Sequence, residues 1–349
     1  MRIAGVARAL PAHRYHQEEI TGALKRHWAE KLARPELLDR LHSRTGVRER
    51  HLAFALERYE TFQTWGESNA AWLEVASHLG ERAIDAALER CGMARGDADA
   101  LFVVSVTGIA SPSLDARLIN RMGLRPDLKR TPIFGLGCVG GAVGLTRAAD
   151  YVRAYPEQVA ILLSVEICSL TIRPDDLSTA NLISTGLFAD GAVAAVVAGS
   201  ARRAEGPSIV DTRSVFYPQT EEIMGWEISE KGFRMVLSPK LPDLIRCRLT
   251  RDVDSFLARH RLGRHDIGTW VIHPGGPRVI EAVQDALGLD GRELELSWDC
   301  LARFGNLSSG SVLQVLEETI AHRRPTPGTK GLILAMGPGF CSEILLIEW

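Results

Sequence analysis

Hydrophobic residues recur along the chain at two alternating spacings, and this alternation indicates an α/β protein. In residues 72–93, "WLEVASHLGERAIDAALERCGM", apolar residues return every three or four positions, as on one face of a helix. Residues 99–108, "DALFVVSVTG", then form a continuous apolar run typical of a buried strand. Residues 251–263 and 266–276 repeat the same order of helix, aspartate, strand and glycine. The pattern predicts sheets covered by helices.

A second repeat indicates that the α/β unit occurs twice. Phe134-Gly135 opens a run of small residues and a predicted helix, and the apolar run "VAILLSV" follows. Phe304-Gly305 opens "NLSSGSVLQVLEETIAHRR", and "KGLILAMG" follows at nearly the same distance. We therefore predict two similar halves, residues 1–205 and 206–349. Chance similarity between α/β segments is the alternative.

A cysteine between glycines, Cys138 in "GLGCVGGAVGL", is the first candidate for chemistry. Free cysteine is usually buried and inert, so a structural thiol is the alternative. The neighbouring glycines bring backbone close to whatever the sulfur meets. Cys138 also stands at the start of a predicted helix, where unpaired N–H groups and the helix dipole favour a thiolate. These residues alone leave two interpretations of Cys138 open, a buried structural thiol and a nucleophile whose pKa is lowered.

Two further residues are placed to complete a catalytic set with Cys138. His273 ends the apolar strand in "WVIHPGG", where α/β proteins place ligands, although a strand-capping histidine would also fit there. Asn306 in "RFGNLSSGS" occupies the place in the second half that Cys138 has in the first, although asparagine is also a good helix N-cap. In such a set an imidazolium stabilises a thiolate and an amide holds an oxyanion. Papain-like proteases use the same residue types, but their Trp-bearing cysteine motif is absent.

Composition argues against several other classes of protein. Lys and Arg number 41 and Asp and Glu 43, so the basic surplus of a nucleic-acid-binding protein is absent. The start "MRIAGVARALPAHRY" does not resemble a signal peptide, and no apolar run reaches the roughly 18–20 residues of a membrane span. The six cysteines are scattered, which fits reduced thiols and gives no metal-binding pattern. We expect a cytoplasmic protein without a metal site.

Five segments, in order, resemble hallmark segments of the type III polyketide synthases, the chalcone-synthase-like members of the thiolase superfamily. They are "GLGCVGGAVGL", "GLFADGAVAAVV", "VIHPGGPRVIEAV", "GNLSSGSVL" and "MGPGF". The resemblance extends from about residue 3 to the C-terminus. It implies the thiolase fold, a five-layered αβαβα arrangement of two similar halves, in a homodimer. It also implies an acyltransferase that needs no acyl carrier protein and no cofactor, with acyl-CoA and malonyl-CoA as substrates.

The resemblance also implies a role for each of the three candidate residues. Cys138 would take an acyl group from a CoA thioester. Malonyl-CoA would lose CO₂, and its enolate would attack the Cys138 thioester. His273 and Asn306 would donate hydrogen bonds to the thioester carbonyl and to the developing enolate oxygen. The chain would be extended a few times and then cyclised.

Other residues match positions that shape the cavity and the CoA tunnel in this family. Phe188 matches an aromatic gatekeeper, and Met235 stands where the second gatekeeper is commonly Phe. Ser111 stands where plant members often place a methionine that reaches into the partner's cavity. Matches to the cavity wall and the cyclisation loop are Cys168, Thr171, Ser308, Gly337, Pro338 and Gly339. Near the family's CoA-phosphate cluster lie Arg44, Arg48 and Arg50, which a solvated basic face would explain as well.

The segment "MGWEISEKGFRMVLSPKLP" resembles the bacterial alkylpyrone and alkylresorcinol synthases, which accept fatty acyl-CoA starters. Val106 departs from the tetrahydroxynaphthalene synthases, which commonly carry a cysteine there. We therefore expect a medium- or long-chain starter with two or three malonyl extensions, and a small phenolic product is the alternative. A fatty-acid-initiating ketoacyl synthase is a further rival, but it typically has His-Gln-Ala-Asn where this chain has "HPGG". An inactive scaffold would be expected to lack one of the three catalytic residues.

Overall fold

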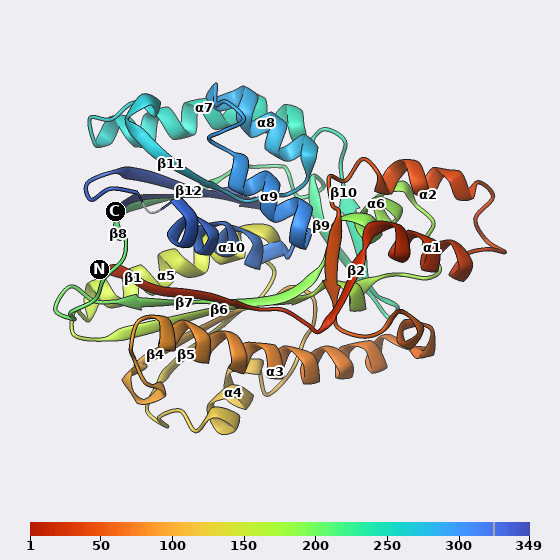
Figure 1. Cartoon of the computed structure of the whole chain (residues 1–349), viewed down its shortest axis with the longest axis horizontal. Helices are drawn as coiled ribbons and strands as arrows, with labels where there is room; N and C mark the ends of the chain where they lie inside the picture. Colours follow the sequence, from red (N-terminus) through yellow and green to blue (C-terminus); the bar gives the residue numbers. More distant parts are fainter. Residues whose placement is uncertain (324) are drawn as a thin grey trace.

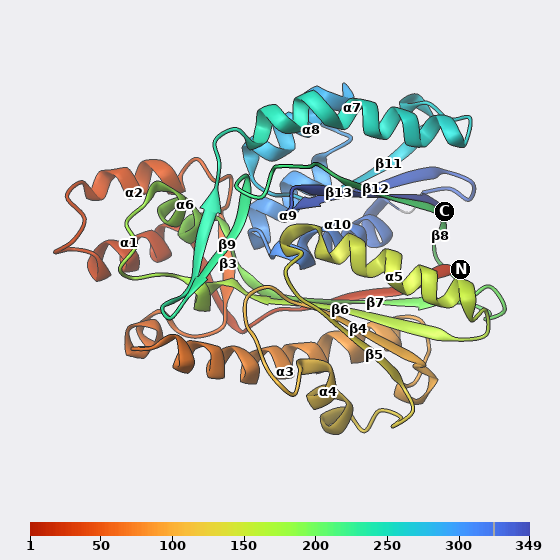
Figure 2. The same cartoon turned by 180° about the vertical axis from the view of Figure 1, so that it is seen from behind.

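The computed structural model of the chain, which describes residues 1–323 and 325–349, has five alternating layers of helix and sheet (Figure 1). An outer helical layer is followed by a sheet, a central helical layer, a second sheet and a second outer helical layer. The view from behind shows the same order (Figure 2). The five-layered αβαβα arrangement predicted from the sequence is confirmed.

The two sheet layers belong to one nine-stranded sheet that folds back over the central helices. The N-terminal layer contains, in spatial order, β5 (Lys129–Ile133), β4 (Ala100–Val104), β6 (Val159–Ile167), β7 (Asp190–Ala198) and β1 (Arg2–Ala9). The C-terminal layer continues with β8 (Ser208–Phe216), β13 (Cys341–Glu348), β12 (Lys330–Gly337) and β11 (Ile267–Ile272). Every residue of β6 and β7 is buried, because helices cover both faces of this layer.

Helices fill the three remaining layers. One outer face is covered by α3 (Trp65–Arg90) and α4 (Leu114–Met122), and the other by α7 (Leu241–Arg259) and α8 (Pro277–Leu287). Between the sheets lie α5 (Gly140–Ala154), α9 (Glu295–Phe304) and α10 (Ser311–Glu318). The central elements pack closely because α5 begins with glycines: a Cβ at Gly141 would lie 2.1 Å from the Ser309 carbonyl oxygen. Among the helices described, none combines the length and apolar character needed to cross a membrane.

Shorter elements gather at one end of the layers, on the right in Figure 1. They are β2 (His13–His16), α1 (Gln17–His27), α2 (Pro35–His42), β3 (Glu49–Leu52), α6 (Thr179–Leu187), β9 (Met224–Ser229) and β10 (Gly232–Leu237). The remaining short helical turns are η1 (Leu56–Thr61), η2 (Arg95–Asp97), η3 (Gly137–Val139), η4 (Cys168–Thr171), η5 (Arg264–Asp266), η6 (Ser308–Gly310) and η7 (Thr319–Arg323). β4 runs parallel to β6, and β11 runs parallel to β12. The carboxyl ends of these four strands lie toward this end of the layers, where α/β proteins place ligands (Figure 1).

The two halves match element by element, since α5, β6 and β7 correspond to α10, β12 and β13. A short turn precedes the central helix in both halves, η3 in the first and η6 in the second. Cys138 lies within η3, but Asn306 lies ahead of η6. The predicted correspondence of these two residues is therefore wrong in detail, because Asn306 is held in an extended bridge with Phe188 before the chain turns into η6.

Candidate active site

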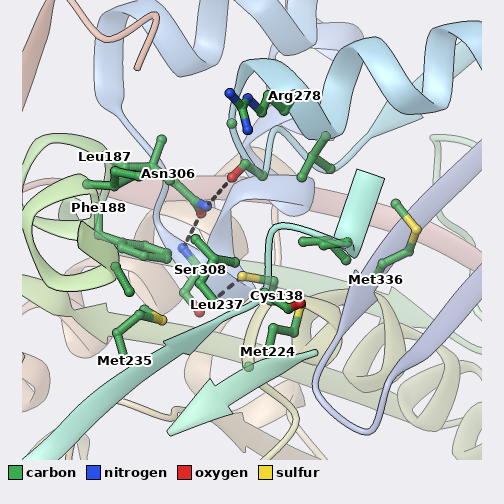
Figure 3. A pocket seen from close by; sticks show the side chains of 18 of the residues that line it. Cys138, Leu187, Phe188, Met224, Met235, Leu237, Arg278, Asn306, Ser308 and Met336 are labelled. Atoms are coloured by element: carbon green, nitrogen blue, oxygen red, sulfur yellow. Dashed lines mark hydrogen bonds between the residues drawn. The ribbon is translucent and has the colours of Figure 1, made fainter. Parts of the chain in front are cut away.

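A cavity of about 550 Å³ opens where the strands' carboxyl ends meet, and Cys138, His273 and Asn306 all line it. Residues that directly follow three strands reach this cavity: Cys168 after β6, His273 after β11 and Pro338 after β12. Val106, two residues after the end of β4, also lines it. Figure 3 shows Cys138 and Asn306 from within it. The structure thus brings together three side chains that are far apart in the sequence.

Cys138 is 5% exposed, and its Sγ lies 3.8 Å from the Ser308 hydroxyl. Glycine is required beside it, because a Cβ at Gly137 (φ +50°) would lie 2.7 Å from Cδ of Pro338. Burial raises the pKa of the thiol to about 12, although hydrogen bonds from Ser308 and Asn306 favour the thiolate. The lowered pKa expected from the helix start is wrong for the thiol considered alone, because desolvation outweighs the hydrogen bonds that favour the thiolate.

His273 is 2% exposed, and its backbone N–H donates to the Leu334 carbonyl at 2.9 Å. Within the described residues, neither ring nitrogen has a hydrogen-bond partner. Burial lowers the pKa of the imidazole to about 3, so the ring is neutral at neutral pH. A neutral ring with two unpaired nitrogens in a cavity is available to a ligand, and its side chain does not act as a strand cap.

The Asn306 side chain has one end fixed and the other available. Its Oδ1 accepts from the Ser308 backbone N–H at 2.8 Å and from the Ser311 hydroxyl at 3.2 Å. These two donors identify the oxygen end of the amide and leave the NH₂ group for the cavity side. Nδ2 donates to the Gly275 carbonyl at 3.3 Å and retains a second proton. Asn306 therefore organises the turn before α10 and also presents a donor near Cys138.

A buried carboxylate, Glu166, lies at the end of β6 behind the cavity wall. It accepts hydrogen bonds from the Val106 backbone N–H at 3.0 Å and from the Thr107 hydroxyl at 2.8 Å. The Ser309 hydroxyl donates to its other oxygen. Burial raises the pKa of this carboxyl to about 7. The network ties the ends of β4 and β6 to the turn before α10, so it joins three loops that form the site.

The β9–β10 hairpin forms one wall of the cavity. Met224 pairs with Leu237 and Trp226 with Met235 across the antiparallel ladder, and all four side chains line the cavity. Their two-residue spacing places them on the same face of the hairpin. Phe188 follows α6 and lies on the same side of the cavity as Met235 (Figure 3). Both predicted gatekeepers thus line the cavity.

The other predicted wall residues divide into two groups. Cys168, Ser308 and Pro338 line the cavity, whereas Thr171 lies outside it and donates to the Cys168 carbonyl at 2.7 Å. Thr171 therefore supports the turn that carries Cys168. Ser111 is exposed at the surface and does not reach this chain's own cavity.

Gly337 and Gly339 flank Pro338 and do not line the cavity themselves. A Cβ at Gly337 would lie 2.6 Å from the Leu136 carbonyl oxygen, and Gly339 has a φ of +132°. Both positions need glycine, one for close approach and the other for its backbone conformation. Their contribution is to let the Pro338 loop pack against the turn that carries Cys138.

Of the three predicted CoA-binding arginines, Arg44 lines the cavity, whereas Arg48 is exposed outside it. Arg50 is 2% exposed, and its guanidinium donates to the backbone carbonyls of Thr185 and Phe188. The prediction that Arg50 contacts a CoA phosphate is therefore wrong, because protein encloses the side chain completely.

Two charged residues of the site were not predicted from the sequence. Arg278, at the start of α8, lines the cavity, and among the described residues neither Arg278 nor Arg44 has an ion-pair partner. Arg278 could have been suspected from the sequence because it directly follows the His273 loop, in "HPGGPR". Glu166 gave a weaker signal, as an acidic residue within an otherwise apolar strand run.

Comparisons with known proteins agree on one family. Residues 2–201 match the N-terminal domain, and residues 208–348 the C-terminal domain, of the chalcone and stilbene synthases. The chain is 50% identical to a 1,3,6,8-tetrahydroxynaphthalene synthase of Streptomyces peucetius subsp. caesius, covering 99% of this chain and 93% of that protein. It is 35% identical to a putative chalcone synthase of Bacillus subtilis, covering 99% and 98%. The crystal structure of 1,3,6,8-tetrahydroxynaphthalene synthase from Streptomyces coelicolor, a bacterial type III polyketide synthase, matches with a TM-score of 0.92 at 30% identity, covering 100% and 99%.

A thiolase fold whose cysteine, histidine and asparagine line one apolar cavity defines a condensing enzyme that transfers acyl groups. The chain belongs to the chalcone and stilbene synthase family and is a type III polyketide synthase. These matches do not support the alternatives of a ketoacyl synthase or a papain-like protease.

Proposed function

We propose that the enzyme loads an acyl group from a CoA thioester onto Cys138, extends it with malonyl-CoA and cyclises the product. The observation that carries this proposal is the convergence of Cys138, His273 and Asn306 on one cavity. Membership of the family supports CoA thioesters as substrates, taken without an acyl carrier protein.

Loading begins with proton transfer from Cys138 to His273. The high pKa of Cys138 disfavours an isolated thiolate, and the low pKa of His273 disfavours an isolated imidazolium in this buried site. The proton transfer creates the thiolate and the imidazolium together. Their mutual attraction offsets part of the desolvation cost of the pair. The thiolate attacks the thioester carbonyl carbon, and the CoA thiolate that leaves accepts the proton from His273.

Extension places negative charge on the malonyl thioester oxygen as the bond to CO₂ breaks. The N–H of His273 and the NH₂ of Asn306 are donors for that oxygen. The enolate carbon then bonds to the carbonyl carbon of the Cys138 acyl thioester, and the Cys138 thiolate leaves. The apolar side chains of Phe188 and Met235 keep water from the reacting groups.

The cationic residues at the cavity suit a phosphorylated substrate. Arg44 and Arg278 line an otherwise mostly apolar cavity without an ion-pair partner among the described residues. Guanidinium groups form strong charge-assisted bonds with phosphate, so we assign these two to the CoA phosphates. We also propose a homodimer, in which the exposed Ser111 faces the partner's cavity.

The product proposed first is a polyhydroxylated aromatic of the tetrahydroxynaphthalene class, supported by the 50% identity over 99% of the chain. The ten carbons of that ring system correspond to five two-carbon units, so malonyl-CoA alone can supply them. An alkylpyrone or alkylresorcinol from a long acyl starter is the second candidate, favoured by the flexible thioethers of Met224 and Met235 in the cavity wall.

One assay tests the function and separates the two products. The purified enzyme is incubated with labelled malonyl-CoA alone, and then with an added C2–C18 acyl-CoA series, and the products are identified by mass. A ten-carbon aromatic from malonyl-CoA alone supports the first product, and alkyl-bearing products support the second. Absence of any condensation product with either substrate set would contradict the proposed function.

A further inference from the structure

The C-terminal end of α6 reaches the cavity, and every carbonyl of its last turn has a partner. A helix leaves its last four carbonyls without partners inside the helix, so their partners show what holds its end. The backbone N–H of Phe188 donates to the Ser184 carbonyl, and the backbone N–H of Asn306 donates to the Leu187 carbonyl. Side chains bond the remaining carbonyls. Gln17 donates to the Gly186 carbonyl, and Arg50 donates to the Thr185 carbonyl and to that of Phe188, the residue after the helix.

Arg50 is the partner that also reaches the catalytic asparagine loop. Its guanidinium lies 2.8 Å from the Thr185 carbonyl oxygen and 2.5 Å from that of Phe188. Its aliphatic stem fills the space under Gly305, where a Cβ would lie 2.9 Å from Cδ of Arg50. Gly305 directly precedes Asn306. One side chain therefore touches both sides of the bridge between Phe188 and Asn306.

That bridge connects the gatekeeper to the oxyanion donor through the backbone. The Asn306 N–H donates to the Leu187 carbonyl at 2.9 Å, and the Ala189 N–H donates to the Asn306 carbonyl at 3.0 Å. The side chains of Phe188 and Asn306 both enter the cavity from this bridge (Figure 3). A shift of the end of α6 would therefore move the aromatic ring and the amide relative to Cys138.

We propose that Arg50 is a positioning residue that fixes the Phe188 ring and the Asn306 amide around the malonyl thioester without touching the substrate. The proposal rests on the proposed function of this cavity. It assigns Arg50 to the decarboxylation and condensation steps, which use both groups, rather than to acyl loading on Cys138.

The electrostatic surroundings keep Arg50 charged for this role. Burial lowers the pKa of the guanidinium to about 10, and the nearby Asp190 carboxylate opposes that shift. Asp190 is held by the backbone N–H groups of Ala53 and Ser169, at 2.7 and 2.8 Å. Arg50 thus remains a cation at neutral pH, placed against the negative end of a helix dipole.

The test compares acyl loading with condensation in Arg50→Lys, which keeps the charge but loses the forked pair of donors. Loading is measured as the mass increase of Cys138, and condensation and malonyl-CoA decarboxylation as initial rates. We expect loading to stay within about threefold of the parent, while the other two rates fall on the order of 10- to 100-fold, the cost of a misplacement near 1 Å. Leu88→Ala in the core of α3, remote from the cavity, is the control for lost stability, and its two activities should change in equal proportion.

A double-mutant cycle adds a readout that a merely structural role would not change. If Arg50 acts through the gatekeeper, Arg50→Lys should cost less condensation activity in a Phe188→Leu background than in the parent. Additive losses, or equal falls of loading and condensation in Arg50→Lys, would overturn the proposal. If Arg50→Lys does not fold, Gln17→Leu tests the same helix end, and unchanged condensation relative to loading in that variant contradicts the proposal. A parent enzyme without condensation activity would instead contradict the proposed function.

Discussion

At the scale of single residues, burial sets the protonation of the two groups that exchange a proton in the proposed mechanism. It raises the pKa of the Cys138 thiol to about 12 and lowers the pKa of the His273 imidazole to about 3. A lone thiolate or a lone imidazolium is therefore disfavoured, and the reactive form of Cys138 depends on the pair. The position of the cysteine at a helix start predicted the opposite shift, because local sequence does not give the depth of a side chain.

The first prediction concerns the pH dependence of Cys138 alkylation by iodoacetamide. In the parent, the His273 pair supplies thiolate, so the alkylation rate should change little between pH 6 and 8. In His273→Ala the thiol keeps its high pKa, so the rate at neutral pH should be lower and should rise about tenfold per pH unit. Mass spectrometry of Cys138 measures the rate, with Cys168→Ala in both backgrounds to remove the other cavity thiol. Equal slopes in the two proteins would show that His273 does not activate the cysteine.

The second prediction separates the two ends of the Asn306 amide. Asn306→Asp keeps an oxygen for the Ser308 N–H and the Ser311 hydroxyl but removes the donor, so malonyl-CoA decarboxylation should fall by roughly 10²–10³. Ser311→Ala removes one bond to the oxygen end and keeps the donor, so its loss should be much smaller. The assay follows CO₂ release from labelled malonyl-CoA. Equal losses in the two variants would mean that Asn306 serves only the turn.

The third prediction concerns Arg278, which has no ion-pair partner among residues 1–323 and 325–349. Arg278→Gln removes one cation from the cavity and should raise KM for malonyl-CoA about tenfold with little change in kcat, since a bond to a charged group is worth about 1.5–3 kcal/mol. Arg48→Gln is the matched control, because Arg48 is exposed outside the cavity. Steady-state rates over a malonyl-CoA series measure both constants. A fall in kcat at unchanged KM would place Arg278 in the chemistry instead.

At the scale of elements, the segment "SRTGVRER" combines a basic composition with the two-residue alternation of a strand. Its arginines suggested one basic surface, but the segment leads into β3, whose side chains alternate between two faces. Arg50 and Leu52 point inward and are buried, while Glu49 and His51 are partly exposed. The inward face could be predicted from this two-residue period, but the α6 carbonyls that Arg50 caps could not, since they lie 135 or more residues away.

The fourth prediction belongs to the second candidate product and concerns the β9–β10 hairpin as the wall that would limit the length of an acyl starter. Met235→Phe should shift the preferred acyl-CoA to shorter chains, and Trp226→Ala to longer ones, because both side chains line the cavity. Each buried CH₂ contributes roughly 0.8 kcal/mol, or about fourfold in kcat/KM. The control is Ile228→Ala, since Ile228 is 50% exposed on the same hairpin and does not line the cavity. Unchanged preferences across the C2–C18 series in both wall variants would contradict this role.

At the scale of the whole molecule, the duplicated pattern made the convergence of Cys138, His273 and Asn306 predictable. All three line one cavity, although only His273 directly follows a strand, whereas Cys138 lies in the turn before α5 and Asn306 lies after α9. The contacts between the two halves could not be predicted from the sequence. Glu166 in the first half accepts from Ser309 in the second, and no local pattern links those positions.

The last prediction is a pH-dependent stability that arises from the carboxyl group of Glu166. Its pKa in the folded state is about 7, against an ordinary value of 4.5, because burial disfavours the ionised form. Below about pH 4.5 both states hold the proton and the group costs nothing. As pH rises toward 7 the unfolded state ionises first, so stability falls, and above about 7 the loss is complete at about 3 kcal/mol.

Glu166→Gln should remove this dependence, so its free energy of unfolding in urea should rise by about 2–3 kcal/mol relative to the parent between pH 5 and 8. Glu157→Gln, at an exposed position, should show no such change. A parent and a Glu166→Gln variant whose stabilities stay parallel across this range would mean that the carboxylate is fully stabilised by its hydroxyl and backbone donors.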